Sequence, residues 1–214
     1  VFDGVVMADA NNTDYFNGLT VENNVIMNVA YFAVDIFGWY NYANPPTTGH
    51  LVKCNLITDL GTYNTGSGYD KWGGGVLIYN DNYTRIVDNT MTNVRIGIQT
   101  GNFHDANPGD PMYQVIENNA IQARRLGIFY NLHTGGSVVP LTVSNNNITA
   151  LENSNESGWK GLLMSSLSNA TGVASGNTIN GSGITSLPTT GIEVWNVKND
   201  APANISGGTI SNVD

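Results

Sequence analysis

Apolar and polar positions along this chain repeat a template about every thirty residues. Its anchor is an asparagine followed two residues later by isoleucine or methionine, and the complete copies are at Asn24, Asn55, Asn89, Asn119, Asn146 and Asn177. Gly208 takes the anchor position in one further copy. Successive anchors lie 31, 34, 30, 27, 31 and 31 residues apart. A fixed period of this length, built from short strand-like runs, is typical of a solenoid.

Each copy of the template predicts a strand, a bend and a further strand. An apolar residue lies three positions before each anchor, as Ile116 does before Asn119. Another apolar residue lies two positions after the anchor, as Ile121 does. Alternating apolar positions predict strands, and no stretch keeps a helical spacing over three turns. The three-residue step breaks the alternation, so we expect the chain to bend at the asparagine, which tolerates the left-handed backbone conformation.

The anchors also predict a ladder of side chains. If each copy forms one coil, equivalent asparagines stack at the interstrand spacing of about 4.8 Å. Each amide can then donate to one neighbour and accept from the other, which satisfies a polar group that is turned inward. We therefore expect all the anchor asparagines to stack inside one corner of the coil. A second strand is expected to begin at a glycine in most copies: Gly75, Gly97, Gly127, Gly161 and Gly191.

These repeats resemble the right-handed parallel β-helix proteins, the broad group that includes the pectate-lyase-like folds. The resemblance covers essentially the whole chain. It implies an all-β, single-stranded, right-handed parallel β-helix of about seven coils with an internal asparagine ladder, and parallel crossovers generally prefer this hand. It implies no single function, because lyases, glycoside hydrolases, epimerases, phage spikes and adhesins share the architecture.

Composition narrows the partners that such a solenoid can have. The chain carries 8 Lys and Arg against 17 Asp and Glu, which gives a net charge of −9. This charge argues against nucleic acid, because phosphate binding needs a basic face, and mildly against a polyanionic glycan. No apolar run is long enough to span a membrane. The single cysteine, Cys54, permits no internal disulfide, and we expect a small, buried or half-buried residue there rather than a catalytic thiol.

The repeat is continuous, so we expect one β-helix domain over residues 1–214. Residues 4–7 match the glycine strand of a coil whose asparagine strand is absent, and residues 210–214 finish an asparagine strand. Both ends therefore fall in mid-coil, and neither has an amphipathic helix to cover the open strands. Val1 is not preceded by Met or a signal-peptide pattern, which indicates a mature protein or an excised piece. We expect the ends to pair with another copy or with neighbouring β-helix segments of a longer parent.

Aromatic residues gather in the segments that follow the glycine strands. In a solenoid such segments project from one side, because equivalent positions stack. Rings interleaved with Asn and Asp suit sugars, whose apolar faces stack on rings while their hydroxyls bond amides and carboxylates. The alternative is that the rings pack the loops onto the coil. The candidate ligand-binding residues are Trp39, Tyr40, Tyr42, Tyr79, Tyr83, Phe129, Tyr130 and Trp195, and a second cluster at residues 69–72 and 159–160 precedes the glycine strand.

Candidate catalytic residues are fewer. His104 and His133 fall in adjacent coils and, with Asp105, could supply a general base or a metal pair. Asp81 and Asp105 are the better-placed carboxylate pair for glycoside hydrolysis. Solvated loop side chains explain the same residues, and no His-x-x-x-His or Cys-x-x-Cys spacing occurs. Segments 9–14 and 104–110 are weak calcium candidates that ordinary turn chemistry also explains, and no cofactor is expected.

Two classes of function fit these observations. The favoured interpretation is an extracellular or cell-surface, non-catalytic β-helix module of an adhesin or filament type, with a glycan- or partner-binding loop face. Missing catalytic motifs, open ends and a surface rich in Asn, Thr and Gly favour it. The alternative is a carbohydrate-active enzyme, a polysaccharide lyase or glycoside hydrolase, with its site on the same aromatic face. Clustered carboxylates, or a basic residue beside Asp81 and Asp105, would favour the enzyme.

Overall fold

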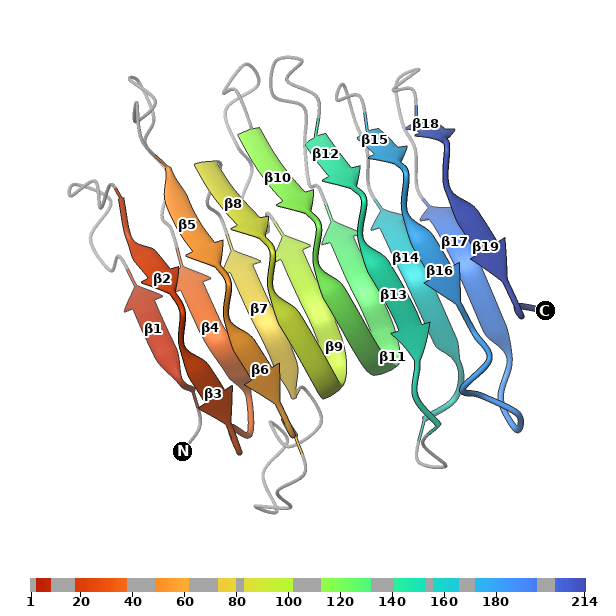
Figure 1. The fold of residues 1–214 in the computed structure, drawn as a ribbon, viewed down its shortest axis with the longest axis horizontal. Helices are drawn as coiled ribbons and strands as arrows, with labels where there is room; N and C mark the ends of the chain where they lie inside the picture. Colours follow the sequence, from red (N-terminus) through yellow and green to blue (C-terminus); the bar gives the residue numbers. More distant parts are fainter. Residues whose placement is uncertain are drawn as a thin grey trace.

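The computed structural model describes residues 3–8, 18–37, 49–61, 73–79, 83–101, 113–131, 141–152, 156–165, 172–195 and 203–214. These residues form an all-β parallel solenoid whose coils follow one another along the long axis (Figure 1). The strands belong to a 7-stranded sheet and a 12-stranded sheet, and all their pairings are parallel. The larger sheet bends, because two of its strands continue across two sides of the coil. We therefore describe three faces.

The first face is the 7-stranded sheet, which precedes the asparagines. Its strands are β2 (Thr20–Glu22), β5 (His50–Lys53), β8 (Tyr83–Val87), β10 (Tyr113–Glu117), β12 (Leu141–Ser144), β15 (Gly172–Ser175) and β18 (Ala203–Ser206). The second face follows the asparagines. It contains β3 (Val25–Met27), β6 (Leu56–Thr58), β13 (Asn147–Ala150), β16 (Thr178–Asn180), β19 (Thr209–Ser211) and the first residues of β9 (Thr90–Gly101) and β11 (Ala120–Asn131).

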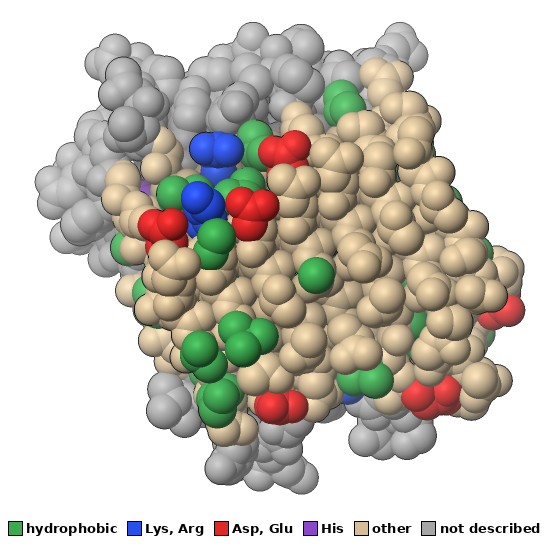
Figure 2. Space-filling view, in the orientation of Figure 1, with side chains coloured by type: hydrophobic (Ala, Val, Ile, Leu, Met, Phe, Trp, Pro, Cys, Tyr) green, Lys and Arg blue, Asp and Glu red, His purple; other side chains and the backbone are tan. Residues whose placement is uncertain are grey.

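The third face carries the glycine strands. It contains β1 (Val5–Ala8), β4 (Phe32–Phe37), β7 (Gly74–Tyr79), β14 (Trp159–Ser165), β17 (Thr189–Trp195) and the later residues of β9 and β11. The strand at residues 5–8 pairs with β4, as expected for a glycine strand that precedes the first complete coil. Figure 2 shows the first and second faces. Basic and acidic side chains gather at the upper left of this view, and most of the remaining surface is uncharged.

The asparagine ladder is confirmed. The side-chain amide of each rung donates to Oδ1 of the next, at Nδ2–Oδ1 distances of 3.1 Å (Asn24–Asn55), 3.0 Å (Asn55–Asn89), 3.0 Å (Asn89–Asn119), 2.9 Å (Asn119–Asn146) and 3.0 Å (Asn146–Asn177). The same oxygens also accept from the backbone N–H of the preceding rung. The rungs from Asn55 to Asn177 are buried and span about four turns, whereas Asn24 is exposed.

The bend itself lies one residue earlier than we expected. The left-handed conformation belongs to the residue before the ladder asparagine, as in Asp88 (φ 57°) and Asn118 (φ 56°). The ladder asparagine can therefore keep its amide aimed along the axis while its neighbour turns the chain. Cys54 occupies one of these positions with φ 54° and is exposed, which corrects the expectation of a buried or half-buried thiol.

The apolar rows that the template predicted fill the inside of the coil. Positions three before the anchor are buried from Val21 to Ala174, and positions two after it are buried from Ile57 to Ile179. Ile205 and Ile210, in the last coil, are each 47% exposed. The core is thus a continuous column that is open at its C-terminal end.

Glycines of the third face lie against the core of the following coil. A β-carbon on Gly97 would lie 2.5 Å from Cγ2 of Ile121, and one on Gly127 would lie 2.2 Å from Cγ2 of Ile148. Gly161 is equally crowded. Distances this short are not tolerated, so the repeated glycine is required by close packing between coils.

In the part of the chain that the structure describes, no helix has the length and apolar character needed to cross a membrane.

Candidate functional site

Many of the predicted site residues lie outside the described residues. These are Trp39, Tyr40, Tyr42, Asp81, His104, Asp105 and His133, together with the two calcium-candidate segments 9–14 and 104–110. Only the backbone of Tyr83 is described, in β8. Among the described residues, no group of three or more His, Cys, Asp and Glu side chains is placed to hold a metal ion.

The four remaining aromatic candidates lie on β7, β11 and β17 and have different surroundings. Tyr79 stacks on Phe37 with ring centroids 4.5 Å apart, and burial raises the pKa of its phenol. Tyr130 is 1% exposed and packs in the core, so it presents no ring face to a ligand. Phe129 is half-buried on the outer side of the third face. Trp195 is 55% exposed.

Phe129 and Trp195 line the same groove. It has a volume of about 400 Å³ and lies on the outer side of the third face. Phe129 from β11 and Leu163 from β14 are register partners, and β14 in turn pairs with β17, which carries Trp195. Phe129 also packs with Ile96 and Leu163 in an apolar cluster that is separate from the main core. The groove therefore has an apolar floor with one open ring at its side.

Basic side chains border this groove. Arg125 and Lys160 line it. Lys160 forms an ion pair with Glu193, with Nζ 2.6 Å from Oε2. The carboxylate of Glu156 binds Arg95, with Nη2 3.1 Å from Oε2, and lies 4.0 Å from Nε of Arg125. The Arg125 side chain is 43% exposed and its guanidinium has five N–H donors, so it can donate to a ligand in the groove as well as face Glu156.

Arg124 braces the corner of the coil beside the groove. Its Nη1 donates to Oδ1 of Asn93 at 2.7 Å, and its Nη2 donates to the carbonyl of Leu60 at 2.6 Å. Burial lowers the pKa of Arg124 and of Arg125, but a guanidinium stays charged in proteins. Half of the 8 Lys and Arg of the chain are thus at this corner, namely Arg95, Arg124, Arg125 and Lys160.

Trp159, which was expected in a surface cluster, has a structural role, and so does His50. Trp159 is 1% exposed, and its Nε1 donates to the carbonyl of Ala123 at 3.0 Å, so it packs the core below the groove. His50 is buried in β5, where its Nδ1 accepts from the N–H of Leu19 at 3.2 Å. Both side chains fix neighbouring coils to each other.

A buried carboxyl group lies at the N-terminal end of the third face. Asp35 is 5% exposed on β4, and its Oδ1 has no hydrogen-bond partner among the described residues. Burial raises the pKa of Asp35 to about 7, and repulsion from Asp3 adds to the shift. Burial also raises the pKa of Asp3, whose Oδ1 accepts from the N–H of Phe32 at 3.3 Å. This pair lies several strands away from the groove.

Sequence reasoning found the rings of the groove and, in the cluster at residues 159–160, Lys160, but it missed Arg125 and its neighbour Arg95. Arg95 and Arg125 each lie six residues after a ladder asparagine, Asn89 and Asn119, so the repeat places them in neighbouring coils. That spacing was the signal that could have paired them. The contribution of Glu156 had no such signal, because it lies in a segment without the template.

Comparisons with known protein families, with curated proteins and with solved structures find no match to this chain.

Proposed function

We propose that this chain is an extracellular or cell-surface, non-catalytic β-helix module that binds a glycan along the outer side of its third face. The observation that carries the proposal is the groove that Phe129 and Trp195 line together, with Arg125 and Lys160 at its border. Rings offer flat apolar surfaces to the carbon face of a sugar, and the guanidinium and ammonium groups can donate to its oxygens. An adhesin or filament component would use this binding without bond cleavage.

The same proposal extends to the form of the solenoid. We propose a right-handed helix of about seven coils, since parallel crossovers favour that hand and the first face has 7 strands. Several coils side by side can then hold successive units of an extended glycan. Each stacked ring contributes on the order of 1 kcal/mol, so one module binds weakly and repeated copies would be needed for firm attachment.

The test is binding of the wild-type protein to an array of neutral and carboxylated oligosaccharides, followed by titration of each hit. Trp195→Ala and Phe129→Ala are each expected to weaken binding about fivefold or more, because about 1 kcal/mol of ring contact is lost. Leu56→Ala is the matched control, since Leu56 is an exposed apolar residue of the second face. Absence of glycan binding, or equal binding by all three variants, would refute the proposal.

One observation favours the second candidate, a carbohydrate-active enzyme. A carboxyl group whose pKa is raised to about 7 by burial, as in Asp35, can hold a proton at neutral pH and act as a general acid. Product analysis of every bound oligosaccharide separates the two functions. Cleavage that is lost in Asp35→Asn would establish the enzyme, whereas intact sugars after long incubation support the binding module.

A further inference from the structure

The charges beside the groove on the third face do not balance. Four cations interact there with three carboxylates, namely Arg95, Arg124, Arg125 and Lys160 with Asp59, Glu156 and Glu193. Lys160 and Glu193 form an ion pair of their own, which leaves three guanidinium groups for two carboxylates. Among the described residues, this corner therefore has one surplus positive charge, although the whole chain has a net charge of −9.

The surplus charge lies on Arg125. Glu156 accepts hydrogen bonds from both Nε and Nη2 of Arg95. Its Oε2 lies 4.0 Å from Nε of Arg125, which is too far for a hydrogen bond. Arg124 is buried and bound to neighbouring coils. Of the three guanidinium groups, that of Arg125 is the one that lines the groove, on a side chain that is 43% exposed.

The surroundings of Arg125 favour an added anion. Burial is the largest cause that lowers the pKa of its guanidinium, and repulsion from Arg95 adds to this shift against a smaller attraction from Glu156. The charged group is thus partly withdrawn from water beside a second cation. A negative group in the groove would offset both effects, because a charge-assisted hydrogen bond is stronger where water is partly excluded.

We propose that the groove takes a glycan in which one sugar carries a carboxylate and the neighbouring sugars are uncharged, with Arg125 bound to the carboxylate. This inference rests on the glycan-binding function proposed above and adds the class of sugar. A guanidinium presents a planar fork of N–H donors that can bond both oxygens of one carboxylate. One surplus positive charge matches one carboxylate, since Lys160 is already paired with Glu193.

The rest of the groove suits uncharged sugars. Its floor is apolar where Phe129 and Leu163 lie, and the hydroxyl groups of Ser157 and Thr190 also line it. Hydroxyl groups both donate to and accept from the hydroxyls of a neutral sugar. Glu193 is the register partner of Leu163, so a second acidic sugar placed towards β17 would be repelled by its carboxylate. A polyanionic chain would also meet the net charge of −9.

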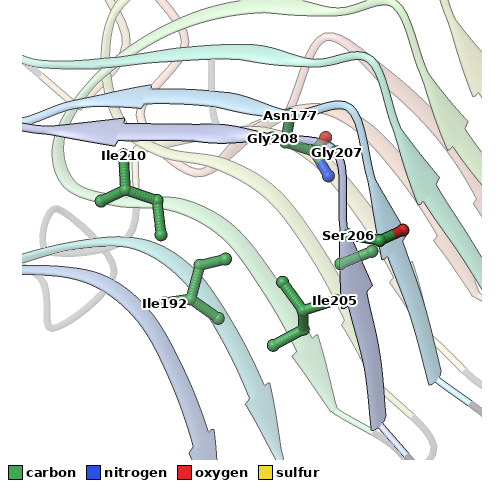
Figure 3. A pocket seen from close by; sticks show the side chains of 8 residues that line it. Asn177, Ile192, Ile205, Ser206, Gly207, Gly208 and Ile210 are labelled. Atoms are coloured by element: carbon green, nitrogen blue, oxygen red, sulfur yellow. The ribbon is translucent and has the colours of Figure 1, made fainter.

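A second pocket, at the last coil, lacks these features. Ile192, Ile205 and Ile210 extend into a space of about 180 Å³ (Figure 3). None of the described residues that line this space is charged, and its polar side chains are those of Asn177 and Ser206. A carboxylate would meet no opposite charge there. The charges of the described residues therefore favour the groove as the place for an acidic sugar.

Matched oligosaccharides test the proposal on the 214-residue chain by isothermal titration calorimetry. Each sugar backbone is supplied in three forms of equal length: with one uronic acid, with that carboxyl reduced to an alcohol, and with a uronic acid at every position. The wild type should bind the singly charged form about tenfold or more tightly than the reduced form, because a hydrogen bond between charged groups is gained. This preference should shrink at high salt. The fully charged form should bind no more tightly than the singly charged one.

Variants of Arg125 assign the preference to this side chain. Arg125→Gln should reduce the preference for the singly charged form to about twofold or less, because the charge and the fork of donors are both lost. Arg125→Lys keeps the charge without the fork and should retain part of the preference. Arg85→Gln is the matched control, since Arg85 is exposed on β8 of the first face, and it should keep the wild-type preference. Circular dichroism checks that each variant folds.

The outcomes separate this inference from the function on which it rests. Equal affinity of the wild type for the singly charged and reduced forms would overturn the inference while leaving glycan binding in place. Tighter binding of the fully charged form, or a preference that survives in Arg125→Gln, would overturn it in the same way. If no form of any backbone binds, the proposed function is refuted and this inference with it.

Discussion

Each buried ladder asparagine is a polar side chain whose partners are copies of itself. Nδ2 of Asn119 donates to Oδ1 of Asn146 at 2.9 Å and to the carbonyl of Ile86 at 2.9 Å, while its Oδ1 accepts from Asn89. Asn89, Asn146 and Ile86 are all buried, so water cannot replace these bonds when they are lost. A ladder asparagine therefore contributes more to the free energy of unfolding than an ordinary surface hydrogen bond does. Its removal leaves unsatisfied polar groups on the two neighbouring rungs.

Asn119→Ala should lower the free energy of unfolding by about 1–3 kcal/mol, since neighbouring donors and acceptors are left unpaired in a dry place. Urea unfolding followed by circular dichroism measures the change. Asn147→Ala is the matched control, because Asn147 is exposed on the second face. Equal destabilisation by the two variants would show that burial of the ladder does not matter.

The carboxyl group of Asp35 makes stability depend on pH. Its pKa is raised from 3.8 to about 7, first by burial and then by Asp3. The folded protein thus keeps a proton that the unfolded chain releases above pH 3.8, so stability is lost as the pH rises from about 4 to about 7.

Asp35→Asn should remove this dependence and raise stability at neutral pH by on the order of 3 kcal/mol. Unfolding titrations at a series of pH values measure it. The contribution of Asp35 makes the wild type more stable at pH 4 than at pH 7. The variant lacks this contribution, so its free energy of unfolding should differ less between the two pH values. A pH profile that is identical in the two proteins would contradict the assignment.

At the scale of elements, the glycine strands set how closely coils can approach. The carbonyl of Gly161 and Cγ2 of Ile148 both lie where a β-carbon on Gly127 would be. Ala33, in the register position of Gly75, shows that a methyl group fits in only one of the described coils.

Gly127→Ala should therefore destabilise the fold by about 1–3 kcal/mol or more, because the added methyl group overpacks the inside of β11. Gly18→Ala is the control: it has left-handed φ (+82°) but open space around its β-carbon, so it bears only the backbone cost of about 1 kcal/mol. Urea midpoints of the two variants and the wild type measure the comparison. A smaller effect at Gly127 than at Gly18 would disprove the packing argument.

The elements were predictable from sequence to the extent that they repeat. Periodicity located the strands around Asn89 and Asn119 because those coils follow the template closely. It misplaced the left-handed residue, since Asp88 and Asn118 precede the anchor and backbone sterics alone do not say which of two adjacent polar residues turns. It also predicted Tyr130 and Trp159 as surface rings, although both are buried. An aromatic residue next to a polar one gives the same sequence pattern in a loop and in a core strand.

The candidate site was less predictable because it depends on what does not repeat. Phe129 and Trp195 were identified as rings, but the groove between them arises from the register of β11, β14 and β17. The ion pair of Arg95 and Glu156 joins residues that lie two anchors apart and at different distances from their anchors, six residues after Asn89 and ten after Asn146, so the template does not pair them. Long-range pairs of this kind leave no local pattern in a single sequence.

Across the part of the molecule that the structure describes, every strand pairs only with strands of the coil before it and the coil after it. Stability in such an array is close to a sum over coils and their junctions, so a coil with one neighbour is the weakest. The coils of Asn89 and Asn119 have a neighbour on each side, and their core side chains Ile86, Met91, Ile116 and Ile121 are buried.

The ladder has one more consequence, which is electrical. All its amides are oriented alike, with carbonyl oxygens towards the Asn24 end and N–H groups towards the Asn177 end. Successive peptide groups along each strand point alternately up and down the axis, so their dipoles largely cancel, but these side-chain dipoles add, and bonds in such a chain polarise one another. The solenoid is therefore a weak axial dipole, negative at its first coil and positive at its last, so opposite poles would face each other whenever copies align in one direction.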